Sequence, residues 1–396
     1  MPNLRFPEFE GEWEEHPTTD YFEFKNGLNP DAKRFGSGIK FISVMDILNN
    51  RYIAYDKIIS SVEAKGNELQ DFGVNYGDIL FQRSSETLED VGRANVYLDS
   101  KTALFGGFVI RGKKIGDYDP LFFRYMLSSP KVRKKIIVKG AGAQHFNIGQ
   151  EGLSKVSLLV PSKKEQNRIG QLLNLIDERI ETQNRIIEKY ESLIYGLLDS
   201  IVAYPKDNKK YKLGELCEIR SGYSGTQNQM CKGLRVSRIE TISNHHINLD
   251  KVGYVEPFEK SKTYKLNIGD ILFSNINSVE YIGNTAYIDK DYALYHGMNL
   301  LRLIPNKTLV NPFYIYCLLN TQRAKNHFKS VCNKAVSQAS INQTELSKTP
   351  IFIPTISKQE NIARLFDILL RKREIERNNL TLFQKQKAYL LKEMFV

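Results

Sequence analysis

Polar and basic side chains follow two apolar runs that have the same sequence. The run Gly-Asp-Ile-Leu-Phe occurs at 77–81, before Arg83, and again at 269–273, before Asn275 and Asn277. Arg reads guanine in the major groove, Asn and Gln read adenine, and Ser contacts bases or phosphates. Because the apolar run repeats while the polar residues after it change, these residues are candidates for sequence-specific DNA contacts.

Further loops carry the same residue types at corresponding places in the two halves of the chain. Lys25 and Asn26 precede a Gly in one half, and Arg220 and Ser221 precede a Gly in the other, with Tyr223 close behind. In this comparison Ser43 aligns with Ser237. The remaining candidates for DNA contact are Ser84, Ser85, Arg93, Gln144, His145, Arg238, His296, Asn299, Lys334 and Gln338. Each residue taken singly could instead belong to a solvated turn, so the prediction rests on groups of residues.

The sequence lacks the common signatures of catalysis. It contains no Gly-x-x-x-x-Gly-Lys-Ser/Thr loop, no Gly-x-Gly-x-x-Gly, no His-Glu-x-x-His and no Gly-x-Ser-x-Gly. The tetrapeptide at 311–314 is similar to one that holds a flipped adenine in methyltransferases. The corresponding segment at 119–122 favours a helix N-terminus at both places. Four Cys without Cys-x-x-Cys spacing and six scattered His predict no metal site, so we expect neither catalysis nor a cofactor in this chain.

Composition limits the class of protein. The 396 residues are 41% hydrophobic and 26% charged, which excludes a disordered, collagen-like or small disulfide-linked chain. A net charge of +11 suits an anionic partner. The first residues have no apolar core like that of a signal peptide, and no window approaches 18 uninterrupted apolar residues. We therefore expect a cytoplasmic protein with reduced cysteines and no membrane association.

One unit of roughly 195 residues occurs twice in the chain. A shift of 193 positions places the segment 153–155 on 346–348, both Leu-Ser-Lys, and Pro161 on Pro354. Each copy begins with short β-branched and aromatic runs separated by Gly, Asn and Asp, which is typical of a mixed sheet. A helix is predicted after Pro120, because Pro suits the first helical turn. These patterns predict two mixed α/β domains at residues 1–155 and 205–348.

A long helix is predicted after each of these domains, at 156–204 and 349–396. Apolar residues recur there at intervals of three and four over more than four heptads, which is typical of a coiled-coil seam. The seam positions are Ile169, Leu172, Ile176, Ile180, Ile187 and Ile194 in the first helix and Ile362, Leu365, Leu369, Leu380, Phe383 and Leu390 in the second. The predicted fold class is α+β, with two pseudo-symmetric domains joined by two long antiparallel helices. Pro205 and the polar residues after it are expected to form the linker between the halves.

This arrangement resembles the specificity subunit of a type I restriction-modification system. The resemblance is carried by residues 144–148, 153–161 and 165–169, and in the second copy by 340–342, 346–354 and 359–362. The repeated Gly-Asp-Ile-Leu-Phe run is also typical of that family's target-recognition domains. The motifs are weak one by one, whereas the duplication with two long helices makes the resemblance specific.

The resemblance implies a non-catalytic DNA reader. In that family each recognition domain reads one half of a split double-stranded DNA sequence. The helices set the spacing and dock two modification subunits, which bind S-adenosylmethionine and methylate adenine. A further restriction subunit uses ATP and Mg. The alternatives are a structural scaffold that does not bind DNA, and a self-standing methyltransferase with degenerate motifs.

Overall fold

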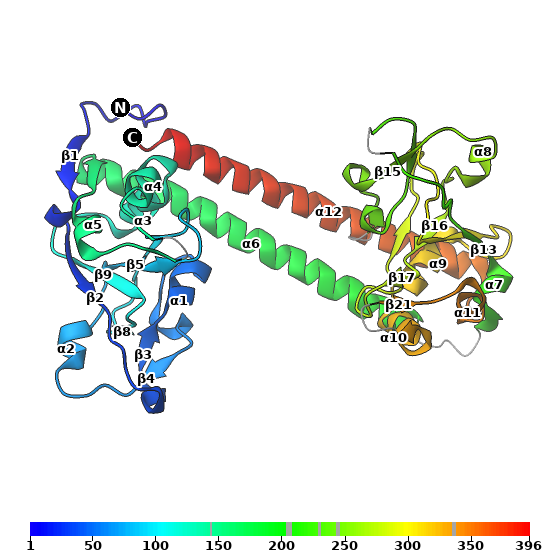
Figure 1. The fold of residues 1–396 in the computed structure, drawn as a ribbon, viewed down its shortest axis with the longest axis horizontal. Helices are drawn as coiled ribbons and strands as arrows, with labels where there is room; N and C mark the ends of the chain where they lie inside the picture. Colours follow the sequence, from blue (N-terminus) through cyan, green and yellow to red (C-terminus); the bar gives the residue numbers. More distant parts are fainter. Residues whose placement is uncertain (143–144, 203–207, 229–230, 243–245, 335–337) are drawn as a thin grey trace. The chain divides into compact units, whose positions relative to one another are not determined.

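The computed structural model describes residues 1–142, 145–202, 208–228, 231–242, 246–334 and 338–396. The chain divides into two compact units, one of residues 1–185 and 378–396 and the other of residues 186–377. Each unit combines a small mixed domain with parts of two long helices, α6 (Lys163–Val202) and α12 (Ile356–Glu393) (Figure 1). The predicted α+β class with an internal duplication is therefore confirmed. The predicted linker residue Pro205 lies outside the described residues.

The central sheet of unit 1 is antiparallel, in the order β2-β9-β5-β7. Its strand β5 (Ile79–Gln82) is buried along its whole length, which explains the continuous apolar run in the sequence. A smaller sheet has the order β4-β3-β8, and its β3–β8 pair is parallel. The other elements of the unit 1 domain are β1 (Glu14–Pro17), β2 (Phe22–Asn26), β3 (Phe35–Ile42), α1 (Val44–Asn49), β4 (Ser61–Val62), α2 (Glu68–Phe72), β6 (Ser84–Ser85), β7 (Ala94–Val96), β8 (Leu104–Phe105), β9 (Val109–Lys114), α3 (Pro120–Ser128), α4 (Pro130–Ile137), β10 (Phe146–Asn147), α5 (Gln150–Ser154) and β11 (Ser157–Val160).

Unit 2 repeats this layout. Its antiparallel sheet has the order β13-β19-β16-β18, and β16 (Ile271–Phe273) takes the central place that β5 has in unit 1. The other elements of its domain are β12 (Lys209–Lys212), α7 (Leu213–Leu216), β13 (Cys217–Ser221), β14 (Leu234–Val236), β15 (Gly253–Val255), α8 (Ser261–Tyr264), β17 (Ile276–Asn277), β18 (Thr285–Tyr287), β19 (Leu301–Pro305), α9 (Pro312–Leu319), α10 (Gln322–Val331), β20 (Asn333–Lys334), β21 (Ala339–Ser340), α11 (Gln343–Ser347) and β22 (Pro350–Ile353).

The same capping arrangement starts the first domain helix of each unit. Asp119 caps α3 by accepting from the Phe122 N–H at 2.7 Å, and Asn311 caps α9 by accepting from the Tyr314 N–H at 3.0 Å. Pro follows the cap in both cases. The tetrapeptide at 311–314 is therefore a helix start, as its counterpart at 119–122 predicted.

A buried glutamine connects each long helix to this cap. Gln166 of α6 accepts from the Asp119 N–H at 2.9 Å and donates to the Pro161 carbonyl. Gln359 of α12 accepts from the Asn311 N–H at 3.0 Å and donates to the Pro354 carbonyl. This repeated clamp accounts for the repeated Pro and Gln in the sequence and fixes each long helix to its domain.

Within each unit the two long helices run in opposite directions. In unit 1 the early part of α6 meets the end of α12, where Lys387 Nζ lies 2.6 Å from Asp177 Oδ1. In unit 2 the late part of α6 meets an earlier part of α12, where Arg377 Nη2 lies 2.6 Å from Glu191 Oε1. The predicted antiparallel pair is confirmed.

The seam departs from the prediction at some positions. Ile169, Ile176, Ile187, Ile194, Leu369 and Leu390 are buried as expected, whereas Leu172, Ile180, Ile362, Leu380 and Phe383 are only half-buried. Leu365 is 40% exposed, because its neighbour Phe366 enters the core of unit 2 in its place. That prediction was wrong by one residue, since the helices must also face their domains and not only each other.

Two absences apply to the part of the chain that the structure describes. No helix there is long and apolar enough to cross a membrane. No group of three or more His, Cys, Asp or Glu side chains there could hold a metal ion. Cys217, Cys317 and Cys332 are buried and form no disulfide.

Candidate nucleic-acid interface

The polar residues after β5 and β16 occupy equivalent places. The Gln82 N–H donates to the Arg93 carbonyl at 2.8 Å, and the Ser274 N–H donates to the Asn284 carbonyl at the same distance. Counting from these positions, Arg83 of unit 1 corresponds to Asn275 of unit 2. The polar side chains at the end of the central strand therefore differ on a scaffold that is the same in both units.

Arg83 belongs to a polar surface that also contains an exposed aromatic ring. Its guanidinium Nη1 donates to the Gly107 carbonyl at 3.3 Å, and its backbone N–H donates to the Phe108 carbonyl. Phe108 itself is 68% exposed. Next to Arg83, β6 pairs with β10, where Ser84 Oγ donates to Asn147 Oδ1 and Ser85 lies opposite Phe146. The sequence comparison missed Phe108 and Asn147, because no residue-type rule singles out an exposed aromatic ring in a turn.

The equivalent surface of unit 2 is built from amides. β16 ends at Phe273, and β17, which pairs with β21, begins at Ile276, so Asn275 and Asn277 lie just beyond the end of the central strand β16. Asn275 Oδ1 is buried without a hydrogen-bond partner among the described atoms, while Asn277 Nδ2 donates to Ser274 Oγ at 3.1 Å. A buried unpaired carbonyl oxygen is a place where a donor from a ligand would gain a hydrogen bond.

A second polar surface surrounds Arg238. The Ser43 N–H donates to Asp46 Oδ2, and the Arg238 N–H donates to Thr241 Oγ1, so Ser43 corresponds to Arg238. The predicted alignment of Ser43 with Ser237 was wrong by one residue, because sequence shifts cannot locate a one-residue difference in loop length. Arg238 is exposed, and its guanidinium has no hydrogen-bond or ion-pair partner among the described residues.

Arg238 and Asn299 line one open hollow of about 480 Å³ in unit 2. Asn299 has a positive φ of 65°, a left-handed conformation that Asn adopts more readily than most other non-Gly residues. The hollow is lined by Ser224, Gly225, Thr226, Gln227, Arg238, Ile239, Glu240, Met298 and Asn299. Its donors and acceptors could contact base edges or phosphates.

Two predicted contact residues are buried and do not reach the surface. His296 is 1% exposed, and its Nε2 donates to the Leu300 carbonyl at 2.9 Å. Burial lowers its pKa to about 4, so the ring is neutral at pH 7. Ser237 is fully buried, and its Oγ accepts from the Gly297 N–H at 3.0 Å. Both side chains bond to the backbone of the segment 297–300, and their burial argues against a direct contact with DNA.

The other candidates lie in partly or fully exposed positions. Lys25 and Arg220 occupy the same register, opposite Arg111 and Arg302 respectively. Lys25 lies 3.9 Å from Asp71, and Arg220 pairs with Glu218. Tyr223 stacks on Phe258 with ring centroids 3.9 Å apart and is half-buried. Of the remaining candidates, Asn26 is half-buried and Arg93 pairs with Asp90. His145, Lys334 and Gln338 are exposed. Gln144 lies outside the described residues.

The aspartate of the repeated Gly-Asp-Ile-Leu-Phe run has a structural role in both units. Asp270 accepts from the Asn267 N–H at 2.7 Å and lies 2.6 Å from Arg302 Nη2, with both side chains buried. Asp78 accepts from the backbone N–H groups of Asn75 and Lys114. Burial raises the pKa of both carboxyl groups above the usual value. These carboxylates fix the turn that leads into the central strand, β5 in unit 1 and β16 in unit 2.

A buried ionic cluster in unit 1 holds the domain to both helices. Asp177 of α6 accepts from the Tyr125 hydroxyl at 2.8 Å and lies 3.4 Å from Arg124 Nη1, in addition to its contact with Lys387 of α12. Asp177 is 6% exposed, so these contacts replace its lost hydration. Within unit 1, these contacts therefore pack the mixed domain and the two long helices into one body.

Comparisons with known proteins agree with this architecture. The sequence pattern of the family described as "Type I restriction modification DNA specificity domain" matches residues 10–192 and again residues 205–382. A specificity subunit assigned to the MjaX type I restriction enzyme of Methanocaldococcus jannaschii is 41% identical over 200 residues, which cover 48% of this chain and 46% of that relative. The match thus spans less than half of that relative's length.

Solved structures share the fold over the whole chain. The crystal structure of the S subunit of a type I restriction-modification system from M. genitalium has a TM-score of 0.62 at 17% identity, covering 100% of this chain and 99% of that one. A structure described for complex assembly and conformational transition of the type I R-M system has a TM-score of 0.60 at 13% identity, covering 98% of each chain. At these identities the likeness establishes the fold.

Proposed function

Because the chain belongs to the family of type I restriction-modification DNA specificity subunits, we propose that each unit reads one half of a bipartite DNA target in the major groove. The observation that carries this proposal is the exchange of Arg83 for Asn275 at equivalent ends of the central strand. Arg favours guanine and Asn favours adenine. The two half-sites therefore differ, and the whole target is asymmetric.

The recognition surface of each unit combines base-reading and phosphate-binding groups. In unit 1 these are Arg83, Ser84 and Asn147, with Phe108 beside them as an apolar contact for a thymine methyl group. In unit 2 they are Asn275, Asn277 and the hollow around Arg238. The helices carry only +3 of the net charge of +11, so most of the positive charge that attracts DNA lies in the recognition domains.

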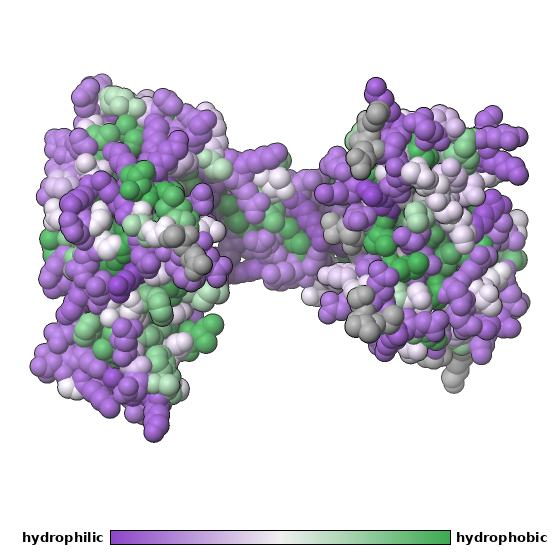
Figure 2. Space-filling view, in the orientation of Figure 1, coloured by the Kyte–Doolittle hydropathy of each residue, from purple (hydrophilic) through white to green (hydrophobic). Residues whose placement is uncertain are grey.

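The helix pair is proposed to set the spacing between the half-sites and to dock two modification subunits. A 40-residue helix is about 60 Å long, enough to separate two groove segments by more than one turn of DNA. Exposed apolar side chains interrupt the hydrophilic surface of the helices (Figure 2). They are Leu175, Leu193, Tyr195, Ile356, Leu365, Ile368, Ile375, Leu382 and Tyr389. Such residues favour a protein partner over solvent.

The chain is proposed to act without catalysis of its own. The modification subunits would bind S-adenosylmethionine and methylate adenine, and restriction subunits would supply ATP- and Mg-dependent cleavage. The sequence carries none of the catalytic motifs sought above. This supports a complex in which the partner subunits carry out the catalysis. A cytoplasmic location is proposed for the whole complex.

Mapping of methyladenine tests this function. The chain is expressed with its modification subunit in a host that lacks adenine methylation, and modified sites are mapped across the genome. We expect a split motif with two different halves and one modified adenine in each. A continuous motif would contradict the two-unit reading. An absence of marks despite a stable complex with an active partner would favour the alternative, a scaffold that does not bind DNA.

A further inference from the structure

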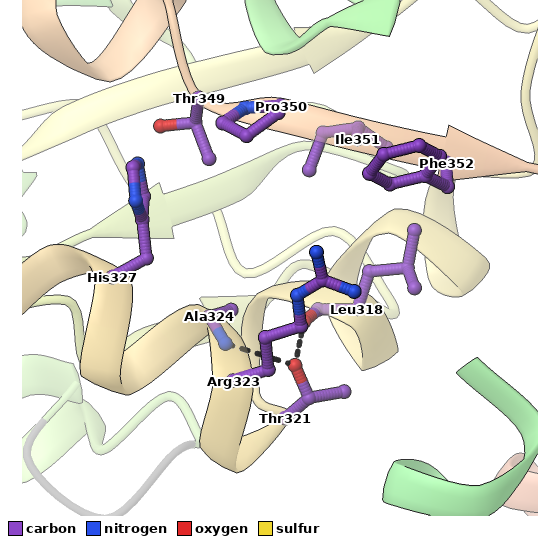
Figure 3. A pocket seen from close by; sticks show the side chains of 9 residues that line it. All are labelled: Leu318, Thr321, Arg323, Ala324, His327, Thr349, Pro350, Ile351 and Phe352. Carbon is purple, nitrogen blue, oxygen red and sulfur yellow. Dashed lines mark hydrogen bonds between the residues drawn. The ribbon is translucent and has the colours of Figure 1, made fainter. Parts of the chain in front are cut away.

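Unit 2 contains a cavity of about 130 Å³ between α10, the end of α9 and the start of β22 (Figure 3). It is lined by Leu318, Thr321, Arg323, Ala324, His327, Thr349, Pro350, Ile351 and Phe352. None of these is a residue proposed above to contact DNA or a modification subunit. The cavity is large enough for a small organic group, and its lining contains a cation and no carboxylate.

One polar group of this cavity lacks a partner. Thr349 is 3% exposed, and its Oγ1 is buried without a hydrogen-bond partner among the described atoms. A buried hydroxyl without a partner costs free energy, and a ligand that accepts from it removes that cost. The Thr349 hydroxyl therefore identifies a place for an acceptor atom.

Two further donors border the same space. The Arg323 guanidinium lies over the Phe352 ring, with its carbon 5.5 Å from the ring centroid, and Figure 3 shows it directed into the cavity. The His327 ring stands on the side of the cavity where Thr349 carries its hydroxyl. Guanidinium groups have donors only and match carboxylates well. Burial lowers the pKa of His327, so this ring is neutral at pH 7 and keeps one N–H to donate.

In unit 1 a lysine side chain crosses the equivalent place. Ser129 caps α4 as Thr321 caps α10, so Lys135 corresponds to His327. Lys135 Nζ reaches across to the Ser157 carbonyl at 3.2 Å, and the counterpart of Thr349 is the buried and apolar Val156. The shorter His327 and the polar Thr349 are thus specific to unit 2, which argues that its cavity is more than a packing defect of the shared fold.

We propose that the cavity of unit 2 binds a carboxylate group carried on a short apolar body. The carboxylate accepts from Arg323, His327 and Thr349. The apolar body packs against Pro350 and Ile351. The group comes either from a free small acid or from an acidic residue of a bound protein, and the chemistry of recognition is the same for both.

Calorimetric titration of the full-length chain with butyrate and with butyramide tests this proposal. The two ligands have the same shape, and only butyrate carries the charge. We expect butyrate to bind at least about tenfold more tightly than butyramide, because the uncharged amide loses the charge-assisted contact with Arg323 and places its NH2 group against a guanidinium that can only donate. Thr349→Val, which keeps the shape, is expected to weaken butyrate binding by about tenfold.

Two further variants sharpen the test. His327→Lys introduces the residue of unit 1, whose ammonium group is expected to bond the Pro350 carbonyl as Lys135 bonds that of Ser157, and so to abolish butyrate binding by filling the cavity. Lys329→Ala, which removes a positive charge from α10 outside the lining, is expected to leave it unchanged. Absence of butyrate binding by the unaltered chain, equal binding of butyramide, or full binding by Thr349→Val would each overturn the proposal, and Thr349→Val keeps it testable if His327→Lys does not fold.

The source of the carboxylate follows from repeating the titration on the complex with the modification subunit. Loss of butyrate binding in the complex assigns the occupant to an acidic residue of the partner. Retained binding assigns it to a free acid. Because the readout is butyrate binding, this result is separate from the mapping of methyladenine that tests the proposed function.

Discussion

At the scale of single residues, Arg83 offers the most direct test of base reading. Arg83→Ala should relax or weaken recognition of one half-site by about 1–3 kcal/mol if the guanidinium makes a paired contact with guanine. The readout is the set of methylated sites produced by the complex. Asn275→Ala, the matched change in unit 2, should affect only the other half-site. An equal loss on unrelated sequences would make Arg83 a phosphate contact instead.

The pair Ser43 and Arg238 tests whether equivalent positions encode different bases. Arg238→Ser gives unit 2 the residue of unit 1, and we expect it to lose discrimination at one position of the second half-site by about 1–3 kcal/mol. Lys262→Ser, at an exposed lysine of α8 outside the hollow, is the control and should not change the motif. An unchanged second half-site in the Arg238→Ser map would remove this hollow from the recognition surface.

The buried carboxylates of the two units predict unequal costs of the same mutation. Asp270→Asn leaves the Arg302 charge buried without its partner, and we expect a loss of about 3–5 kcal/mol in the free energy of unfolding of unit 2. Asp78→Asn should cost less, because it breaks no ion pair among the described residues, although the amide oxygen can replace only one of the two carboxylate oxygens, which accept separately from the Asn75 and Lys114 N–H groups. Hydrogen exchange of peptides from each unit measures both effects. Equal costs would contradict a specific role for the Asp270–Arg302 pair.

At the scale of elements, the last turn of α12 and the residues just after it are part of the core of unit 1. Phe395 is fully buried against Trp13 and Phe122, with ring centroids 6.4 and 5.5 Å away. Phe395→Ala should therefore lower the free energy of unfolding of unit 1 by about 3–5 kcal/mol and leave the exchange rates of unit 2 unchanged. Tyr389→Ala, at a 57% exposed position of the same helix, is the matched control. Similar protection in both variants would show that this end of the helix does not stabilise unit 1.

The sequence predicts the positions of the helices and strands well. It predicts less well which residues of a helix face the core. Apolar periodicity located both long helices, and the repeated Pro before Leu or Phe located α3 and α9, because these signals depend on local geometry. Leu365 was assigned to the seam where Phe366 is buried, since a helix that packs on two partners at once has no single period. His296 and Ser237 have the residue types of DNA contacts, yet tertiary packing buries them. No local sequence pattern indicates this burial.

At the scale of the whole molecule, the proposed spacer role of the helix pair makes a geometric prediction. Inserting seven residues into each of α6 and α12, at the same level of the pair, adds two helical turns and keeps the seam in phase. The addition lengthens each helix by about 10.5 Å, which corresponds to about three base pairs at 3.4 Å each. We expect the mapped target to keep both half-sites and to gain about three base pairs between them.

The seam supplies the control for this experiment. Seven residues added to α6 alone leave the Asp177–Lys387 contact of unit 1 and the Glu191–Arg377 contact of unit 2 unable to form together, because the two helices then differ in length between these pairs. That variant should lose stable methylation of any split site. If the double insertion kept the original spacing, the distance between the half-sites would be set by the partner subunits and not by the helices. If it changed the half-site sequences instead, the separation between reading domains and spacer helices would be wrong.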